Sequence, residues 1–264
     1  MKKLTAVIIC FLFVGGGDVF AGPGQKDNWE LGIEISSIKY EEPEVMRENG
    51  TMYGMYSSCT WYRKYLFRIE GGFSFGKVDY KNSGTMNGIT DYMWEFRSLA
   101  GKDFFLSTAS VITPYIGLGY RYLSDDMGGK VSSTGALGYK RESNYLYSPL
   151  GIETITELKD GWSIGVTIEY DYFWKGMQRS YIGEAIIGLN NLDNDQNGGY
   201  GMRGSIKLQK KGADIDQIIE PFIRYWNIEK SEEQDVTYTG IILGVGYEPK
   251  NTSTQFGVKF TARY

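Results

Sequence analysis

The sequence predicts an all-β fold, a transmembrane antiparallel up-and-down β-barrel, on three observations. Large apolar residues alternate with small or polar ones along much of the chain, as in strands with one apolar face. The composition, with 35 Gly, 21 Tyr and only 6 Pro in 264 residues, favours strands. The mean hydropathy is −0.32, and no long apolar run follows the N-terminus, which excludes a helical membrane protein.

The first 21 residues have the pattern of a secretory signal peptide. Two lysines precede an apolar stretch that ends at Val14, and Val19 and Ala21 supply small residues at positions −3 and −1 of a cleavage site. The alternative, a short membrane anchor, would need a longer apolar run. We therefore expect a signal peptide at 1–21 and a single barrel domain at 22–264.

Charge and cysteine content exclude two classes of protein. The formal net charge of −4 argues against a nucleic-acid partner, because such partners attract basic surfaces. Removal of the signal peptide would leave Cys59 as the one cysteine of the mature chain. A lone cysteine cannot form an intrachain bridge, so an exported disulfide scaffold is excluded.

The alternation is clearest between Trp162 and Trp174, where every second residue is large and apolar or aromatic. The residues between them form a polar face of Ser163, Gly165, Thr167, Glu169 and Asp171. The same period occurs over 65–75, 92–97, 115–122 and 219–226. A face rich in glycine and in charges of both signs suits a crowded lumen, and the Tyr and Trp near strand tips suit interfacial girdles.

Eleven segments have strand character: 29–40, 51–62, 65–80, 89–101, 112–123, 145–157, 162–175, 199–208, 217–229, 237–247 and 253–264. Single-chain bacterial barrels have an even number of strands. We expect ten, with 237–249 in the last surface hairpin or extending the final strand, because Pro249 interrupts a ladder. Twelve strands, with one more around Ala185 to Gly188, and eight are the alternatives. The 51–62 segment has no clean register, so the side of Cys59 stays open.

The expected connections alternate between short and long. Short turns are expected at 63–64, 159–161 and 211–212, and longer polar loops at 41–50, 81–88, 124–143 and 176–198. We place the four longer loops outside the cell.

The last residues resemble the C-terminal β-signal of bacterial outer-membrane proteins. Phe256, Val258, Phe260 and Tyr264 alternate with small or charged residues, and the chain stops on the aromatic. The resemblance implies recognition by the barrel-assembly machinery. Tyrosine stands here where phenylalanine is the more usual final residue.

Most of the mature chain resembles small outer-membrane barrels of the porin-like or outer-membrane β-barrel-domain group. The similarity is sharpest over 114–123, 141–147 and 248–252. It implies a location in the outer membrane of a Gram-negative bacterium. It also implies contact with outer-membrane lipid, lipopolysaccharide, periplasmic chaperones and the assembly machinery. It implies no catalytic residues, and no extracellular partner can be identified.

The chemistry available to the chain is limited because it contains no histidine. Outer-membrane proteases of the omptin type and outer-membrane phospholipases use histidine, so a base or triad of that kind is impossible. Carboxylate-only hydrolysis by Glu169 and Asp171, two residues apart on one face, remains as a lesser hypothesis. We expect no enzymatic activity and no cofactor.

The alternation also predicts which charges enter the lumen. Such charges must pair or be hydrated, because an unpaired buried charge costs several kcal/mol. The structural interpretation is an ion-pair network, and the functional one is a charged constriction that selects ions. The predicted lumen charges are Glu34, Arg68, Glu70, Glu95, Arg97, Arg121, Glu153, Glu169, Asp171, Arg203, Lys207, Glu220, Arg224, Lys259 and Arg263.

One segment matches the opening of a calcium-binding loop. Asp193, Asp195 and Asn197 are followed by Gly198, as in D-x-D-x-N-G, but Gly204 stands where the closing glutamate should be. A hydrated surface turn is the simpler interpretation. We therefore expect no metal site, with these three residues as a weak calcium candidate.

Two hypotheses for function follow. The first is a non-enzymatic structural or surface-interaction scaffold whose loops at 124–143 and 176–198 face the exterior. The second is a narrow, porin-like channel that passes ions or small solutes through the charged lumen. Ten strands favour a closed or narrow interior, since about eight leave a filled barrel and sixteen an open channel.

Overall fold

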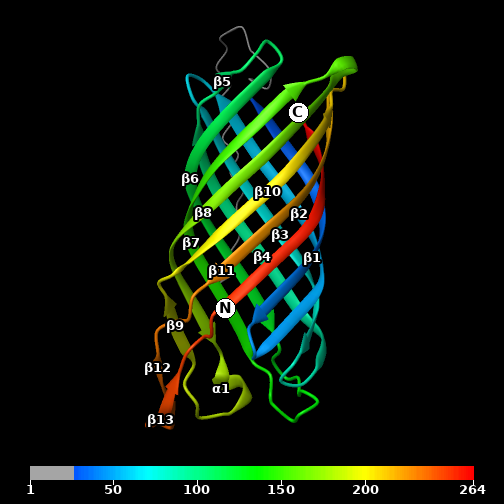
Figure 1. Ribbon diagram of the computed structural model, residues 1–264. Helices are drawn as coiled ribbons and strands as arrows, with labels where there is room; N and C mark the ends of the chain where they lie inside the picture. Colours follow the sequence, from blue (N-terminus) through cyan, green and yellow to red (C-terminus); the bar gives the residue numbers. More distant parts are fainter. Residues whose placement is uncertain (1–26) are drawn as a thin grey trace, which may run out of the picture.

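Ten long antiparallel strands close into a barrel in the computed structural model, which describes residues 27–264 (Figure 1). The expected signal peptide lies outside the described residues. The barrel strands are β1 (Asn28–Glu42), β2 (Met46–Tyr62), β3 (Leu66–Lys81), β4 (Met86–Gly101), β6 (Ser110–Asp126), β7 (Lys140–Glu157), β8 (Trp162–Ser180), β10 (Gly199–Lys210), β11 (Asp216–Ile228) and β14 (Asn251–Arg263). The predicted all-β class and the count of ten strands are confirmed.

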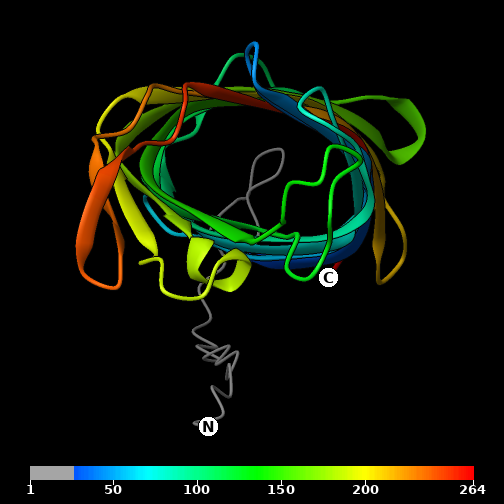
Figure 2. The same cartoon turned by 90° about the horizontal axis from the view of Figure 1, so that it is seen from below.

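Neighbouring barrel strands follow one another along the chain, so the topology is up-and-down as predicted. β14 pairs with both β1 and β11, and β8 pairs with β10, which completes the ring. Viewed along its axis, the wall is continuous (Figure 2). Closure gives every barrel strand two neighbours and removes the unpaired edges of an open sheet.

The two ends of the barrel differ. At the end where Trp29 pairs with Tyr264, which we call the termini end, the connections are short. They include the predicted turns after β2 and β10 and a 3-10 turn at Lys159–Gly161, while β5 (Phe104–Phe105) pairs with β6 in the turn after β4. The opposite end, which we call the loop end, carries the five remaining connections.

Strands extend further into the predicted surface loops than the sequence indicated. The expected loop 41–50 is only a three-residue turn at 43–45, because β1 and β2 stay paired as far as Glu42 and Met46. The loops expected at 81–88 and 124–143 shorten to 82–85 and 127–139. The polar residues at these strand ends face the interior or lie on the outer face of a paired strand. Their polarity therefore does not indicate a loop.

The connection after β8 contains α1 (Ile182–Ala185) and β9 (Leu192–Gln196), which pairs only with β8 in the barrel sheet. The extra barrel strand considered around Ala185 is therefore wrong. The connection before β14 contains β12 (Gln234–Tyr238) and β13 (Ile241–Gly246). These form a hairpin of their own outside the ring, so 237–247 is no barrel strand and belongs to the last surface hairpin, as expected (Figure 2).

The outer face of the barrel is apolar and the inner face polar, in the predicted register. Ile164, Val166 and Ile168 are exposed on the outer face, while Glu169 and Asp171 are buried inside. The unassigned strand β2 has Tyr53 and Met55 outside, and Cys59 shares that face. Among the described residues no helix is long and apolar enough to cross a bilayer.

Inward-facing glycines make room for tyrosine rings that lie across the wall. A Cβ on Gly119 would stand 2.2 Å from the ring of Tyr147, and one on Gly151 would stand 2.3 Å from that of Tyr115. Both rings extend from neighbouring strands into the space that a side chain would need. The glycines therefore allow the two phenols to reach the charged groups of the lumen.

Candidate functional site

Arg203 lies at the centre of the lumen and contacts three carboxylates from two other strands. Its guanidinium donates to Glu95 from β4, with a shortest distance of 2.5 Å, and lies 3.0 Å from Glu169 and 2.9 Å from Asp171 on β8. Tyr147 donates its hydroxyl to Glu95 at 2.6 Å. Since 1% or less of the Glu169 and Asp171 side chains is exposed, Arg203 is the hub of a desolvated cluster.

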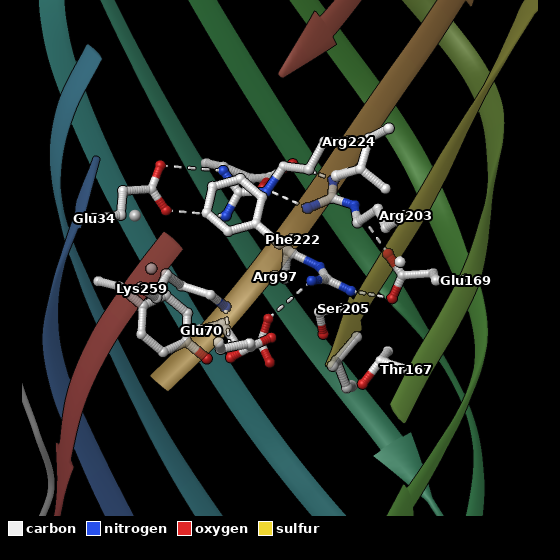
Figure 3. A pocket seen from close by; sticks show the side chains of 18 of the residues that line it. Glu34, Glu70, Arg97, Thr167, Glu169, Arg203, Ser205, Phe222, Arg224 and Lys259 are labelled. Carbon is white, nitrogen blue, oxygen red and sulfur yellow. Dashed lines mark hydrogen bonds and ion pairs between the residues drawn. The ribbon is translucent and has the colours of Figure 1, made fainter. Parts of the chain in front are cut away.

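A chain of ion pairs continues from this hub across the interior. Arg97 contacts both Glu169 and Glu70, the latter at 2.9 Å (Figure 3). Arg68 lies 3.6 Å from Glu70 and donates to Glu153 at 2.8 Å. Cations and carboxylates alternate along this chain, so each charge meets opposite charge on both sides.

Nearer the termini end the same network joins the first and last strands. Arg263 donates to Glu30 at 2.6 Å and to Gln209 at 2.7 Å. Lys207 stands 3.8 Å from both Glu30 and Glu153. Since Glu30 lies on β1 and Arg263 on β14, one of these pairs crosses the seam where the barrel closes.

Two more pairs lie on the wall next to the hub, across β11, β14 and β1. Arg224 donates to Glu34 at 3.1 Å (Figure 3). Lys259 donates to Glu220 at 3.0 Å. The Lys259 ammonium also lies 4.5 Å from the centre of the Tyr56 ring. The cavity among the residues of this lumen has a volume of about 90 Å³, enough for several water molecules.

Arg121 is the exception among the predicted lumen charges. Its guanidinium lies 5.5 Å from the Tyr145 ring and 5.7 Å from the Trp226 ring, and donates to Ser253 at 3.4 Å. Aromatic faces attract a cation, which accounts for its burial without an ion pair among residues 27–264.

The structure places all fifteen predicted lumen charges on the inner face, and every one except Arg121 has an ion pair there. Sequence reasoning missed Glu30, although its position four residues before Glu34 gives it the same face. Glu169 and Asp171, considered for carboxylate-only hydrolysis, lie inside the barrel, where arginines pair with both.

Two apolar layers of buried residues lie between this network and the loop end. One layer, from β1 to β4 and β6, includes Met52 and Ile89, both fully buried, and the loop residue Met127. The other, from β7, β8 and β11, includes Tyr147 and Trp226 in edge-on contact with ring centres 5.0 Å apart. Together with the ion pairs, they bury much of the inner face of the barrel.

A second charged cluster lies at the loop end and was missed entirely. Arg141 donates to Glu42 at 2.6 Å and to Asp125 at 3.3 Å, and lies 3.7 Å from Glu248 and 3.9 Å from Glu48. All five side chains are buried. Glu42, Glu48, Asp125 and Arg141 lie within the loops expected at 41–50 and 124–143, so the sequence did not assign them to the lumen.

Glu248 connects the segment before β14 to this cluster. Tyr40 donates its hydroxyl to Glu248 at 2.9 Å. Burial raises the pKa of Glu248 to about 7, and nearby Glu42 adds to this rise while Arg141 opposes it. Folding raises the pKa of Glu248, so the folded protein is stabilised when this carboxyl is protonated. This stabilisation is fully present below the pKa of the unfolded chain, about 4.5, and is lost as the pH rises through about 7.

We expect the Glu248→Gln variant to become more thermally stable than the wild type as the pH rises. Glutamine resembles the protonated carboxyl, so the two proteins should melt together near pH 4.5, and the variant should melt several degrees higher at pH 8. Thermal unfolding of detergent-folded protein across this range measures the difference. Glu233→Gln, an exposed carboxylate of the same connection, should follow the wild type at every pH. A difference in melting temperature between Glu248→Gln and the wild type that stays constant across this pH range would contradict the raised pKa of Glu248.

Two of the three calcium-candidate residues, Asp193 and Asp195, lie on the strand β9, and Asn197 follows its end, so the three do not form the single tight turn that the motif requires. Asp193 pairs with Arg179 at 2.5 Å, Asp195 pairs with Lys175 at 2.8 Å, and both pairs cross from β9 to β8. Asn197 donates to Glu232 at 2.7 Å. Within the described part of the chain, no group of three or more acidic, histidine or cysteine side chains could hold a metal ion.

The residues of the predicted assembly signal lie on the outer face of β14 and just after it. Phe256, Phe260 and Tyr264 are exposed there, and the Tyr264 ring lies 5.9 Å from that of Trp29. Val258 shares this face between the two phenylalanines. They therefore form a continuous apolar ridge along the closing strand.

Comparison with known proteins gives likeness in structure only. No protein-family model and no curated protein matches the chain. The outer-membrane protease OmpT from Escherichia coli is 8% identical, with a TM-score of 0.63 over 94% of this chain and 99% of that one. The toluene transporter TodX from Pseudomonas putida is 8% identical, with a TM-score of 0.36 over 92% and 90% of the two chains. The translocator domain of autotransporter NalP from Neisseria meningitidis is 13% identical, with a TM-score of 0.41 over 89% and 88%.

At sequence identities this low, the comparisons show similarity of fold and give no information about activity. The likeness to OmpT extends over nearly the whole of both chains and agrees with the closed ring of ten strands. The chain is therefore a ten-stranded β-barrel with the overall architecture of the outer-membrane protease OmpT.

Proposed function

We propose that this protein is an integral outer-membrane scaffold of a Gram-negative cell, without catalytic activity, that presents structured connections at the cell surface. One observation carries the proposal: the lumen is filled by ion pairs and apolar layers, with about 90 Å³ left among the central charges. A barrel filled in this way provides a rigid wall and no path for a solute.

The loop end supports the second half of the proposal. It carries α1, β9 and the β12–β13 hairpin, and the hairpin exposes Ile241, Ile242 and Leu243 by more than 60% each. Exposed apolar groups of this size are typical of contact surfaces. We place this end outside the cell and the termini end in the periplasm, where the apolar ridge of β14 would be read by the assembly machinery.

Single-channel recording tests the scaffold against the channel hypothesis. Mature refolded protein should insert into a planar bilayer and stay electrically silent, because ion pairs and apolar layers occupy the lumen. A sixteen-stranded porin in the same bilayer serves as the positive control, and protease protection of the barrel confirms insertion. A steady small conductance whose ion selectivity changes in Glu169→Gln would refute the scaffold and establish the narrow channel.

A further inference from the structure

Three cations stand on the outer face of the barrel, directly beyond its apolar belt at the loop end. On β3 the outward residues Phe73 and Phe75 are followed by Lys77 and Lys81. On β2 the outward residue Arg47 lies opposite Lys81. The outer face therefore changes from apolar to cationic within two residues of Phe75, where the strands approach the loop end (Figure 1).

None of these three cations has an ion pair in the part of the chain that the structure describes. The outward cations on the opposite wall differ, because Lys140, Lys175 and Arg179 pair with Glu142, Asp195 and Asp193 at 2.8 Å or less. At the same level of the barrel, ion pairs thus hold all three cations on one side and none of the three on the other.

Arg47 lies opposite Lys81 on β3 and opposite Glu41 on β1. Like charges directly opposite on neighbouring strands destabilise a sheet. The Nε atom of Arg47 is buried and has no hydrogen-bond acceptor. The two acids on this face have other contacts: Glu41 pairs with Lys39 at 2.7 Å, and Asp79 accepts from the backbone N–H of Gly88 at 2.9 Å.

We propose that Arg47, Lys77 and Lys81 bind the phosphate groups of an anionic lipid in the leaflet at the loop end. A guanidinium matches phosphate oxygens in a fork, and lysine adds a point charge. Lys77 and Lys81 are four residues apart, about 13 Å along a strand, so the band spans two phosphates and not one. The inference rests on the proposed membrane placement, which puts lipid headgroups at this level.

The test compares binding of a bisphosphorylated lipid A to the detergent-folded full barrel by native mass spectrometry. The variant R47S/K77T/K81S should bind about a hundredfold more weakly at low salt, since each cation near an anionic lipid contributes about a fivefold factor. R47K/K77R/K81R, which keeps the charge, should bind as the wild type does. K140T/K175T/R179T removes the same charge from the paired side and should lose less than threefold.

The remaining arms identify the source of the phosphate. Dephosphorylated lipid A should bind wild type as weakly as the intact lipid binds R47S/K77T/K81S. Millimolar inorganic phosphate should not displace the lipid, because a free ion bridges only one end of the band. Equal losses in the two triple variants, or full displacement by inorganic phosphate, would overturn the inference. Bilayer insertion and electrical silence would be unaffected, which separates this failure from that of the proposed function.

Discussion

Val166→Arg should prevent stable folding of the barrel in a bilayer. Val166 is 40% exposed on the outer face of β8, between Ile164 and Ile168, and faces lipid in the proposed placement. An arginine on the lipid face near the midplane costs about 2–4 kcal/mol. The loss of the heat-modifiable, compact form on electrophoresis, measured after refolding into lipid vesicles, reports the effect.

Ile187→Arg provides the matched control. Ile187 is 90% exposed in the connection after α1, outside the barrel wall. An arginine introduced at this position therefore lies in water and not in lipid. This variant should fold as the wild type does. If Val166→Arg folded equally well in vesicles, the outer face of β8 would not contact lipid, and the membrane placement would be wrong.

The alternation of side chains predicted the barrel because it is a local property of each strand. The run from Trp162 to Trp174 gave the correct faces for the whole of that segment. The alternation then breaks at Trp174, where a bulge places Phe173 and Gly176 on the inner face together. A bulge of this kind depends on pairing with β7, so the sequence of β8 alone does not reveal it.

The lumen charges could be assigned from the same period, but their partners could not. Glu95 and Arg203 are 108 residues apart, and only closure of the ring brings them together. The loop-end cluster was missed because polar stretches such as 41–50 were interpreted as loops. In a barrel, a polar stretch can equally be a strand that faces the lumen, and Glu42 and Glu48 are of that kind.

Arg203→Met should destabilise the barrel by about 3–5 kcal/mol, the cost of removing one partner from a buried ionic group. Glu95, Glu169 and Asp171 would lose the guanidinium that they share, while Arg97 would still contact Glu169. Urea unfolding in detergent, followed by tryptophan fluorescence, measures the change in the free energy of unfolding.

Arg179→Met is the control, since its pair with Asp193 is 38% and 49% exposed and should contribute less than about 1 kcal/mol. Adding Glu95→Gln and Asp171→Asn to Arg203→Met should recover part of the loss, because these changes remove the charges left unpaired. If Arg203→Met cost no more than Arg179→Met, water would already hydrate the lumen carboxylates. That result would also predict a measurable conductance, so the unfolding experiment and the bilayer recording test the closed interior independently.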